Sequence, residues 1–205
     1  ILATMVDAKS IFADPRAIQN APEVSKRLAE ILHIPSEKIL KDIGNRKSFV
    51  WIARRLRGPH VEQVENLKLP GISFITEQKR IYPHGRLAAA LVGFVGLDNE
   101  GLSGIELAMD RELRGKSGRI IFEGDPSGRQ IALGEANSIE RPERGQDVVL
   151  SIDLFIQHVT ERALQEIANQ YHPQGISAIV LKVLTGEILA LAPFRLKTAT
   201  AENFL

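Results

Sequence analysis

The side chains best suited to chemistry are Glu106 and the two arginines Arg80 and Arg86. We favour an architectural clamp, in which a partly buried Glu106 pairs with one of the arginines. Breaking such a pair costs about 3–5 kcal/mol when it is buried and almost nothing when it is exposed. Glu106 also follows Ser103 by three residues, the spacing of a capping box that begins a helix. Ligand binding by Glu106 is the less favoured alternative.

A catalytic serine of the penicillin-recognising type needs Ser-x-x-Lys at the start of a helix, because the lysine amine activates the serine hydroxyl. No serine in the sequence is followed three residues later by lysine, and Ser-x-Asn is also absent. The sequence contains no cysteine, which excludes thiol catalysis, disulfides and cysteine-based zinc sites. We therefore expect no catalytic residue in this chain.

Metal and cofactor sites are not expected either. Two histidines four residues apart would be a metal-binding signal, and no such pair occurs among the five histidines. The run from Gly93 to Gly96 lacks the lysine and hydroxyl residues of a phosphate-binding loop. The sequence thus predicts no metal and no cofactor.

The composition is that of an ordinary globular protein, with 205 residues, 44% hydrophobic and 25% charged. The net charge of +1 gives no reason to expect nucleic acid as a partner. No apolar run reaches the roughly 18 residues that span a bilayer. Because the first residues already alternate like a strand and position 1 is Ile, we expect the parent protein to continue before this point.

Hydrophobic periodicity and turn residues divide the chain into helices and strands without regular alternation. We therefore expect the α+β class, with elongated mixed helices and short antiparallel sheets. The predicted helices lie at 20–32, 36–43, 58–67, 86–92, 104–113 and 154–167. The predicted strands lie at 2–13, 47–53, 72–81 and 147–152, with hairpins at 118–133 and 175–191.

A longer motif contains Glu106. It reads Tyr-Pro-x-Gly, a helix of small residues, Gly-Phe-Val-Gly and then Gly-Leu-x-Gly-Ile-Glu. Its structural residues are Arg80, Tyr82, Pro83, Gly85, Arg86, Gly93, Gly96, Gly104 and Glu106. This order resembles the non-catalytic pedestal, or dimerisation domain, of class B penicillin-binding proteins of the septal peptidoglycan D,D-transpeptidase type.

Two later segments extend the resemblance. Val149–Asp153 with Gln157 is similar to the passage that opens the transpeptidase domain in this family, and 175–192 is similar to its first strands. After Pro193 the sequence departs from the family pattern. The resemblance implies a pedestal over residues 1–150 and the start of a truncated transpeptidase domain over 151–205.

The resemblance also implies a function. The module would position a catalytic domain that cross-links peptidoglycan stem peptides in cell division or cell-shape maintenance, on the extracytoplasmic face of a bacterial inner membrane. The parent would be a serine-type D-Ala-D-Ala transpeptidase, anchored by an N-terminal membrane segment absent from this sequence. Implied partners are a lipid II polymerase and bitopic division proteins, and homo-oligomerisation stays open. The alternative is a free-standing peptidoglycan-binding or scaffold domain.

Partner docking would require exposed apolar residues with a charged rim, because such patches are unusual on monomers. We expect docking at the helices around Val24–Leu32 and Val61–Leu67 and at the hairpin near Asp125–Gly128. The alternative is that the apolar faces of these helices only fill the core.

Overall fold

The computed structural model describes residues 1–44, 49–116, 119–120, 138–140 and 143–195. These residues belong to two compact units. The first unit contains Met5–Ile81, and the second contains Ile1–Thr4 together with the described residues from Tyr82 onward. Helices and short antiparallel sheets are mixed in both units, which confirms the predicted α+β class.

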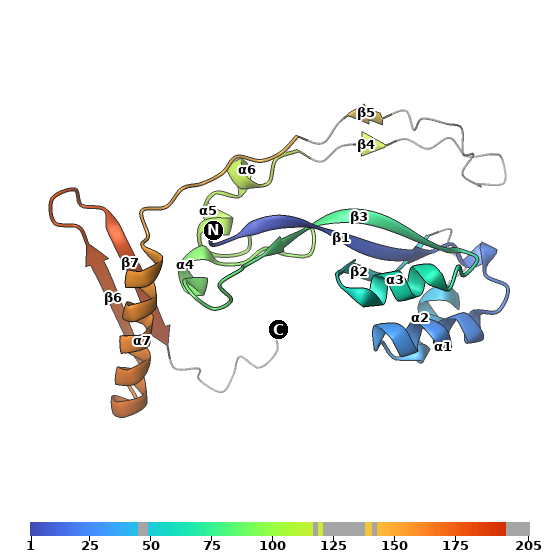
Figure 1. Cartoon of the computed structure of the whole chain (residues 1–205), viewed down its shortest axis with the longest axis horizontal. Coiled ribbons are helices and arrows are strands. Elements are labelled where there is room, and N and C mark those ends of the chain that lie inside the picture. Colours follow the sequence, from blue (N-terminus) through green and yellow to red (C-terminus); the bar gives the residue numbers. More distant parts are fainter. Residues whose placement is uncertain (45–48, 117–118, 121–137, 141–142, 196–205) are drawn as a thin grey trace. The chain divides into compact units, whose positions relative to one another are not determined.

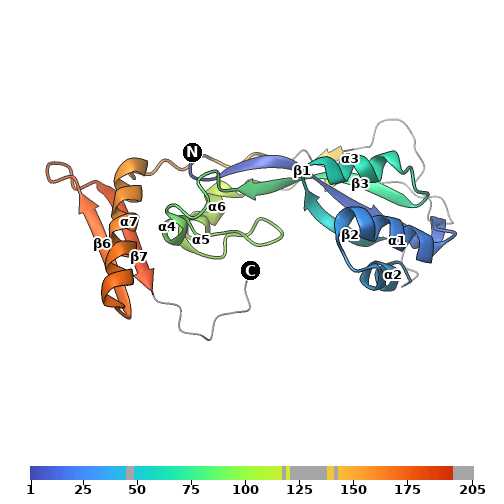
Figure 2. The same cartoon turned by 60° about the horizontal axis from the view of Figure 1, so that its bottom comes forward.

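The first unit is built on a three-stranded sheet with the order β2-β1-β3, in which β1 and β2 are antiparallel (Figure 1). Three helices pack on this sheet, and a short 3-10 turn, η1 (Pro15–Ala17), follows β1 (Figure 2). The strands are β1 (Thr4–Ala13), β2 (Val50–Leu56) and β3 (Ile72–Ile81). The helices are α1 (Ala21–Leu32), α2 (Ser36–Gly44) and α3 (Pro59–Asn66).

The core of the first unit lies between the sheet and the three helices. Ile11 and Leu28 are fully buried there, from β1 and α1. Val64 of α3 and Ile39 of α2 complete the contact with 1% exposure each. Helix α1 begins as its sequence predicts, because the Asn20 side chain accepts the Glu23 backbone N–H at 3.3 Å.

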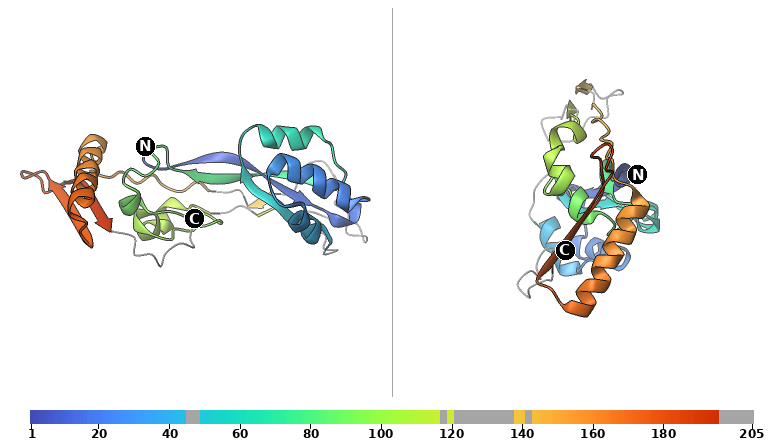
Figure 3. Two further views of the ribbon diagram at one scale, coloured as in Figure 1. Left: turned by 90° about the horizontal axis from the view of Figure 1, so that it is seen from below. Right: turned by 90° about the vertical axis from the view of Figure 1, so that its left-hand side faces the viewer.

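The second unit contains four helices and two sheets among its described residues, each sheet being a pair of antiparallel strands. The long helix α7 lies along the β6–β7 pair (Figure 3). The helices are α4 (Ala89–Val92), α5 (Gly104–Ala108), α6 (Asp110–Leu113) and α7 (Leu154–Tyr171). The strands are β4 (Arg119–Ile120), β5 (Ser138–Glu140), β6 (Gly175–Leu181) and β7 (Ile188–Arg195).

Three predicted elements of the second unit differ from the structure. The helix predicted over 86–92 begins only at Ala89, because Ala88 adopts a left-handed conformation with φ 57°. The helix predicted over 104–113 is divided in two at Met109, whose φ of −114° is not helical. Residues 147–152 belong to no strand.

The predicted turn at Thr185–Gly186 is confirmed. Strands β6 and β7 pair from Gly175 with Arg195 to Leu181 with Ile188, and the chain reverses between them. Gly186 supplies the positive φ of 76° that this turn requires. The hairpin predicted over 118–133 lies almost entirely outside the described residues.

Candidate functional site

The structure describes no cluster of three or more His, Asp or Glu side chains that could hold a metal ion. Among the same residues, no helix has the length and apolar character needed to cross a membrane. We take the motif and the polar groups that hold it as the candidate site.

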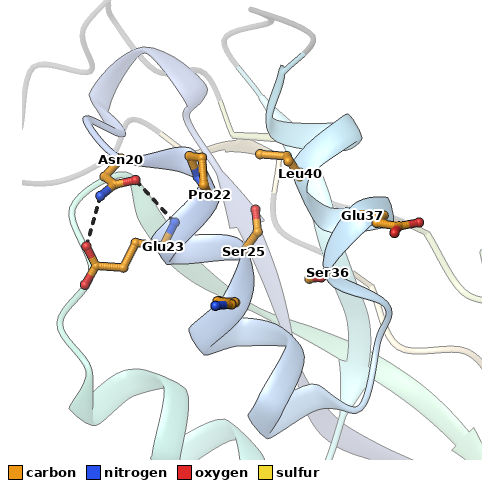
Figure 4. A pocket seen from close by; sticks show the side chains of 8 residues that line it. Asn20, Pro22, Glu23, Ser25, Ser36, Glu37 and Leu40 are labelled. Atoms are coloured by element: carbon orange, nitrogen blue, oxygen red, sulfur yellow. Dashed lines mark hydrogen bonds between the residues drawn. The ribbon is translucent and has the colours of Figure 1, made fainter.

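An open hollow between α1 and α2 carries no chemistry of its own (Figure 4). Asn20 and Glu23 line it; the Asn20 amide donates to the Glu23 carboxylate, and its oxygen accepts the Glu23 backbone N–H as a helix cap. Glu37 and Lys26 add charges of opposite sign. Because its polar groups serve the helix start, we assign this hollow a structural role.

The motif residues follow one another from the end of β3 through α5. Arg80 is half-buried in β3 of the first unit, and the other motif residues belong to the second unit. Half-buried positions are Tyr82, Gly93 and Gly96; exposed ones are Pro83, Gly85, Arg86 and Gly104. Glu106 is buried, with 3% exposure.

Two motif glycines allow the halves of the motif to pack backbone against backbone. Gly93 has φ 81°, and a Cβ there would lie 1.9 Å from the Ser103 carbonyl oxygen. Gly104 has φ 58°, and a Cβ there would lie 2.5 Å from the Leu91 carbonyl oxygen. A larger residue at either position would have to displace main chain, so this contact explains both glycines.

The capping box predicted at Ser103 is not formed. No side-chain hydrogen bond caps α5; instead the Ser103 hydroxyl accepts the Phe94 backbone N–H at 3.3 Å. Ser103 therefore ties the start of α5 to the Gly93–Gly96 run. Arg86 is exposed, which does not suit a buried clamp, whereas the pairing of Glu106 with Arg80 stays a prediction.

A polar network joins the turn at Ala88, which precedes α4 and which we call the motif turn, to α7 and β7. Gln157 is fully buried, and its side-chain amide binds both backbone groups of Leu191: Oε1 accepts the N–H at 2.8 Å and Nε2 donates to the C=O at 3.0 Å. Gln157 Nε2 also donates to Glu161 Oε1 at 2.8 Å. The same Glu161 oxygen accepts the backbone N–H of Ala88 at 2.8 Å.

Sequence reasoning did not identify Glu161. Its signal was present, since Gln157 and Glu161 stand on the same helical stripe as the buried Leu164 and Ala168. Two polar residues on an inward stripe indicate a buried hydrogen-bond network.

The chain that precedes α7 covers the outer edge of β7. The Ser151 hydroxyl donates to the Ile188 carbonyl at 2.7 Å, and the Asp153 N–H donates to the Leu189 carbonyl at 2.9 Å. Gln157 continues this row at Leu191. This edge of the β6–β7 pair is therefore closed to a further strand from Ile188 to Leu191.

The first unit holds a second polar network, which is charged. Glu77 of β3 forms an ion pair with Arg54 of β2, and the two side chains keep 17% and 19% exposure. Glu77 also accepts a hydrogen bond from the Ser10 hydroxyl, whose oxygen in turn accepts the Arg55 N–H at 2.8 Å. The Arg54 hydrogen bond, together with that of Ser10, holds the pKa of Glu77 below its usual range despite partial burial.

Aromatic side chains lie beside this charged network. Phe12 stacks on Phe49 with ring centroids 4.9 Å apart, and Trp51 meets Phe49 edge to face at 4.8 Å. The Arg54 guanidinium lies 4.9 Å from the centroid of the Trp51 ring. With Ile75, the residues Phe12, Phe49 and Trp51 form what we call the aromatic face.

The aromatic face is directed away from the helices, because Ile11, Ala13 and Ile52, the chain neighbours of Phe12 and Trp51, belong to the core. Phe49, Trp51 and Ile75 remain exposed by 43%, 36% and 44%.

The helices predicted to dock partners use their apolar faces for the core instead. Val24 and Leu28 of α1 keep 8% and 0% exposure, and Val61 and Val64 of α3 keep 5% and 1%. The third predicted place, near Asp125–Gly128, lies outside the described residues. Three of the exposed large apolar side chains of the first unit, Phe49, Trp51 and Ile75, lie on the aromatic face, while Met5 and Leu40 are exposed elsewhere.

Comparison with known proteins gives a consistent result. The family model of the penicillin-binding protein dimerisation domain matches residues 1–150. Stage V sporulation protein D of Bacillus subtilis is 32% identical over 194 residues, which are 93% of this chain and 30% of that protein. The peptidoglycan D,D-transpeptidase FtsI of Escherichia coli is 34% identical over 198 residues, which are 93% of this chain and 33% of that protein.

A solved structure shows the same similarity in three dimensions. The crystal structure of a peptidoglycan synthetase from Bifidobacterium adolescentis matches with a TM-score of 0.58 and 27% sequence identity, covering 94% of this chain and 40% of that one. The chain spans about a third of the length of the curated relatives named above.

Proposed function

The chain belongs to the penicillin-binding protein dimerisation domain family, and from this premise we propose that it is the non-catalytic module of a peptidoglycan D,D-transpeptidase. Its task is to position a catalytic domain and to bind other proteins of cell-wall synthesis. One observation carries the proposal: the similarity to relatives named as D,D-transpeptidases covers 93% of the chain and so continues past the family model into α7, β6 and β7.

We propose that residues 151–205 begin a transpeptidase-type domain. Ile179 and Leu181 of β6 are exposed by 59% and 55%, although strand residues of this size are normally covered. The outer edge of β7 is already occupied by Ser151, Asp153 and Gln157. Further strands of the domain would therefore join at β6, and additional chain would cover Ile179 and Leu181.

The parent protein would act outside the cytoplasm, held at the membrane by an N-terminal segment. Its activity would be the cross-linking of peptidoglycan stem peptides by a serine of a Ser-x-x-Lys motif, which no serine of this sequence provides. A free-standing peptidoglycan-binding domain is the weaker alternative, because the relatives continue well beyond the length of this chain.

Covalent labelling with a fluorescent penicillin tests the enzymatic part of this proposal. The 205-residue chain should stay unlabelled, while the full product of its gene should be labelled in a one-to-one ratio. Labelling of the short chain would contradict the absence of a catalytic serine. A full product without Ser-x-x-Lys would overturn the assignment to a transpeptidase.

Protein partners of the proposed function are a membrane-embedded lipid II polymerase and bitopic division proteins, and we place their docking on the aromatic face. Exposed aromatic side chains with an arginine beside them are typical of interface centres. The pair Phe49→Ser and Ile75→Ser removes two exposed side chains of this face without touching the core. We expect this double variant of the parent to lose co-purification with the polymerase.

Leu40→Ser is the matched control, because Leu40 of α2 is exposed by a similar 39% on the other side of the sheet. It should leave co-purification unchanged. Equal losses in both variants, or none in either, would remove the aromatic face as the docking surface.

A further inference from the structure

Glu161 holds a strained part of the motif. Ala88 is 1% exposed and adopts the left-handed conformation, which is strained for a residue with a Cβ. Its backbone N–H donates to Glu161 Oε1 at 2.8 Å. This bond stabilises Ala88 in the conformation that starts α4, whose backbone N–H groups at Leu91 and Val92 then bind the Ala88 carbonyl.

Gln157 connects the same oxygen to β7. Its Nε2 donates one hydrogen bond to Glu161 and one to the Leu191 carbonyl, while its Oε1 accepts the Leu191 N–H. Both N–H hydrogens of this fully buried amide are thus used and its oxygen accepts one bond, which fixes the position of Glu161 relative to the strand. The path from Ala88 to Leu191 passes through two side chains, the half-buried Glu161 and the fully buried Gln157.

We infer that Glu161 and Gln157 are positioning residues that couple the motif turn at Ala88 to strand β7. The inference rests on the proposed function in one respect, namely that β7 belongs to the catalytic domain. A partner that displaces the motif turn would then displace the start of that domain, since the two are joined by a continuous row of part-buried hydrogen bonds. The coupling itself is a property of the second unit alone.

Amide hydrogen exchange of the 205-residue chain, resolved at Ala88 and Leu191, tests this coupling. In Glu161→Ala the Ala88 amide should exchange about tenfold faster, the effect of one lost hydrogen bond. The Leu191 amide should also exchange faster, by about threefold, because Gln157 loses one of the partners that hold it.

Two further variants separate coupling from general destabilisation. Glu161→Gln keeps an acceptor oxygen at the same position, so both amides should keep wild-type rates within about twofold. Glu166→Ala on the same helix removes only the exposed pair with Arg162 and should change neither amide.

The coupling is overturned if Glu161→Ala accelerates Ala88 and leaves Leu191 at the wild-type rate, because Glu161 would then be a local cap. It is also overturned if Glu161→Gln behaves like Glu161→Ala, or if Glu166→Ala has equal effects at both amides.

Should Glu161→Ala fail to fold, the double variant with Ala88→Gly removes the left-handed strain and keeps the backbone N–H. We expect this double variant to fold with a fast Leu191 amide; a wild-type rate there would equally overturn the coupling. None of these measurements uses penicillin or a partner, so failure of the penicillin test would remove the proposed function and leave this result standing.

Discussion

The two units stabilise their polar interiors by different means. In the first unit, Glu77 and Arg54 carry full charges and keep 17% and 19% exposure. In the second unit, the fully buried Gln157 is neutral and satisfies the backbone of Leu191. The difference predicts where each unit is sensitive: the ion pair of Glu77 responds to pH, whereas the buried amide of Gln157 responds to the loss of a donor or acceptor.

The largest effect should come from Gln157→Leu. The substitution leaves the N–H and C=O of Leu191 without their partner in a buried place, and each unsatisfied group costs about 1–3 kcal/mol. We expect the free energy of unfolding of the second unit to fall by about 3 kcal/mol. Denaturant unfolding, monitored by amide exchange in β7, measures this loss of stability. A change below about 1 kcal/mol would show that Gln157 does not stabilise the outer edge of β7.

Glu77→Ala should have the next largest effect. It leaves Arg54 partly buried without its carboxylate and removes the acceptor of the Ser10 hydroxyl. We expect a loss of about 2 kcal/mol at pH 7, the range of hydrogen bonds to charged groups. The Trp51 fluorescence reports unfolding of this unit, because Trp51 is the single tryptophan of the chain and lies beside Arg54. An unchanged unfolding midpoint would show that the Glu77–Arg54 pair contributes no measurable stability, as is common for exposed pairs.

Glu106→Ala should destabilise the second unit by about 1–3 kcal/mol, because a carboxylate that is buried to 3% exposure leaves its polar neighbours unsatisfied when it is removed. Glu106→Gln is the control that retains the size and an acceptor oxygen. A thermal melt with unchanged midpoint in Glu106→Ala would exclude an architectural role for this side chain.

The pH dependence of stability should test the charged network of the first unit. The pKa of Glu77 is lower in the folded protein than its usual value of about 4.3, so the stabilisation is complete above that value. It is lost as pH falls from about 4.3 through the lower folded pKa. The stability difference between wild type and Glu77→Gln should therefore shrink at acid pH. A constant difference for Glu77→Gln would contradict the direction of the shift.

The smallest effect should come from Arg27→Ala, at about 0.3–0.5 kcal/mol. Arg27 pairs with Glu23 one helical turn away at 2.6 Å, and both side chains are about half exposed. High salt should remove this difference, because exposed charges are screened. A loss as large as that of Glu77→Ala would show that burial does not set the strength of pairs in the first unit.

Regular patterns in the sequence were sufficient for much of the fold. The strand predicted over 72–81 has the bounds of β3, and the helix after Asn20 is α1. Both depend on local signals: alternation, a capping side chain and a terminating turn. The motif also identified the correct family, because its order of residues reflects backbone contacts such as that of Gly93 with Ser103.

The parts that sequence reasoning missed depend on distant contacts. Alanine favours helix, so nothing local indicates that Ala88 is left-handed; its conformation is held by Glu161. On α7 the apolar residues Val159 and Ile167 stand at helical spacing, yet they are exposed by 48% and 40%, whereas Gln157 is buried. Polar residues that are buried with all hydrogen bonds made cannot be told from exposed ones by hydropathy.

The bond between Ala88 and Glu161 has a consequence for synthesis of the chain. The two residues are 73 positions apart, so Ala88 leaves the ribosome well before its acceptor exists. By then Met5–Ile81 have already been made, and domains generally fold as units from the N-terminus during translation. The left-handed Ala88 is therefore stabilised only after α7 has been synthesised. A pause of the ribosome between Ala88 and Glu161 would lengthen the time during which the nascent motif lacks this hydrogen bond.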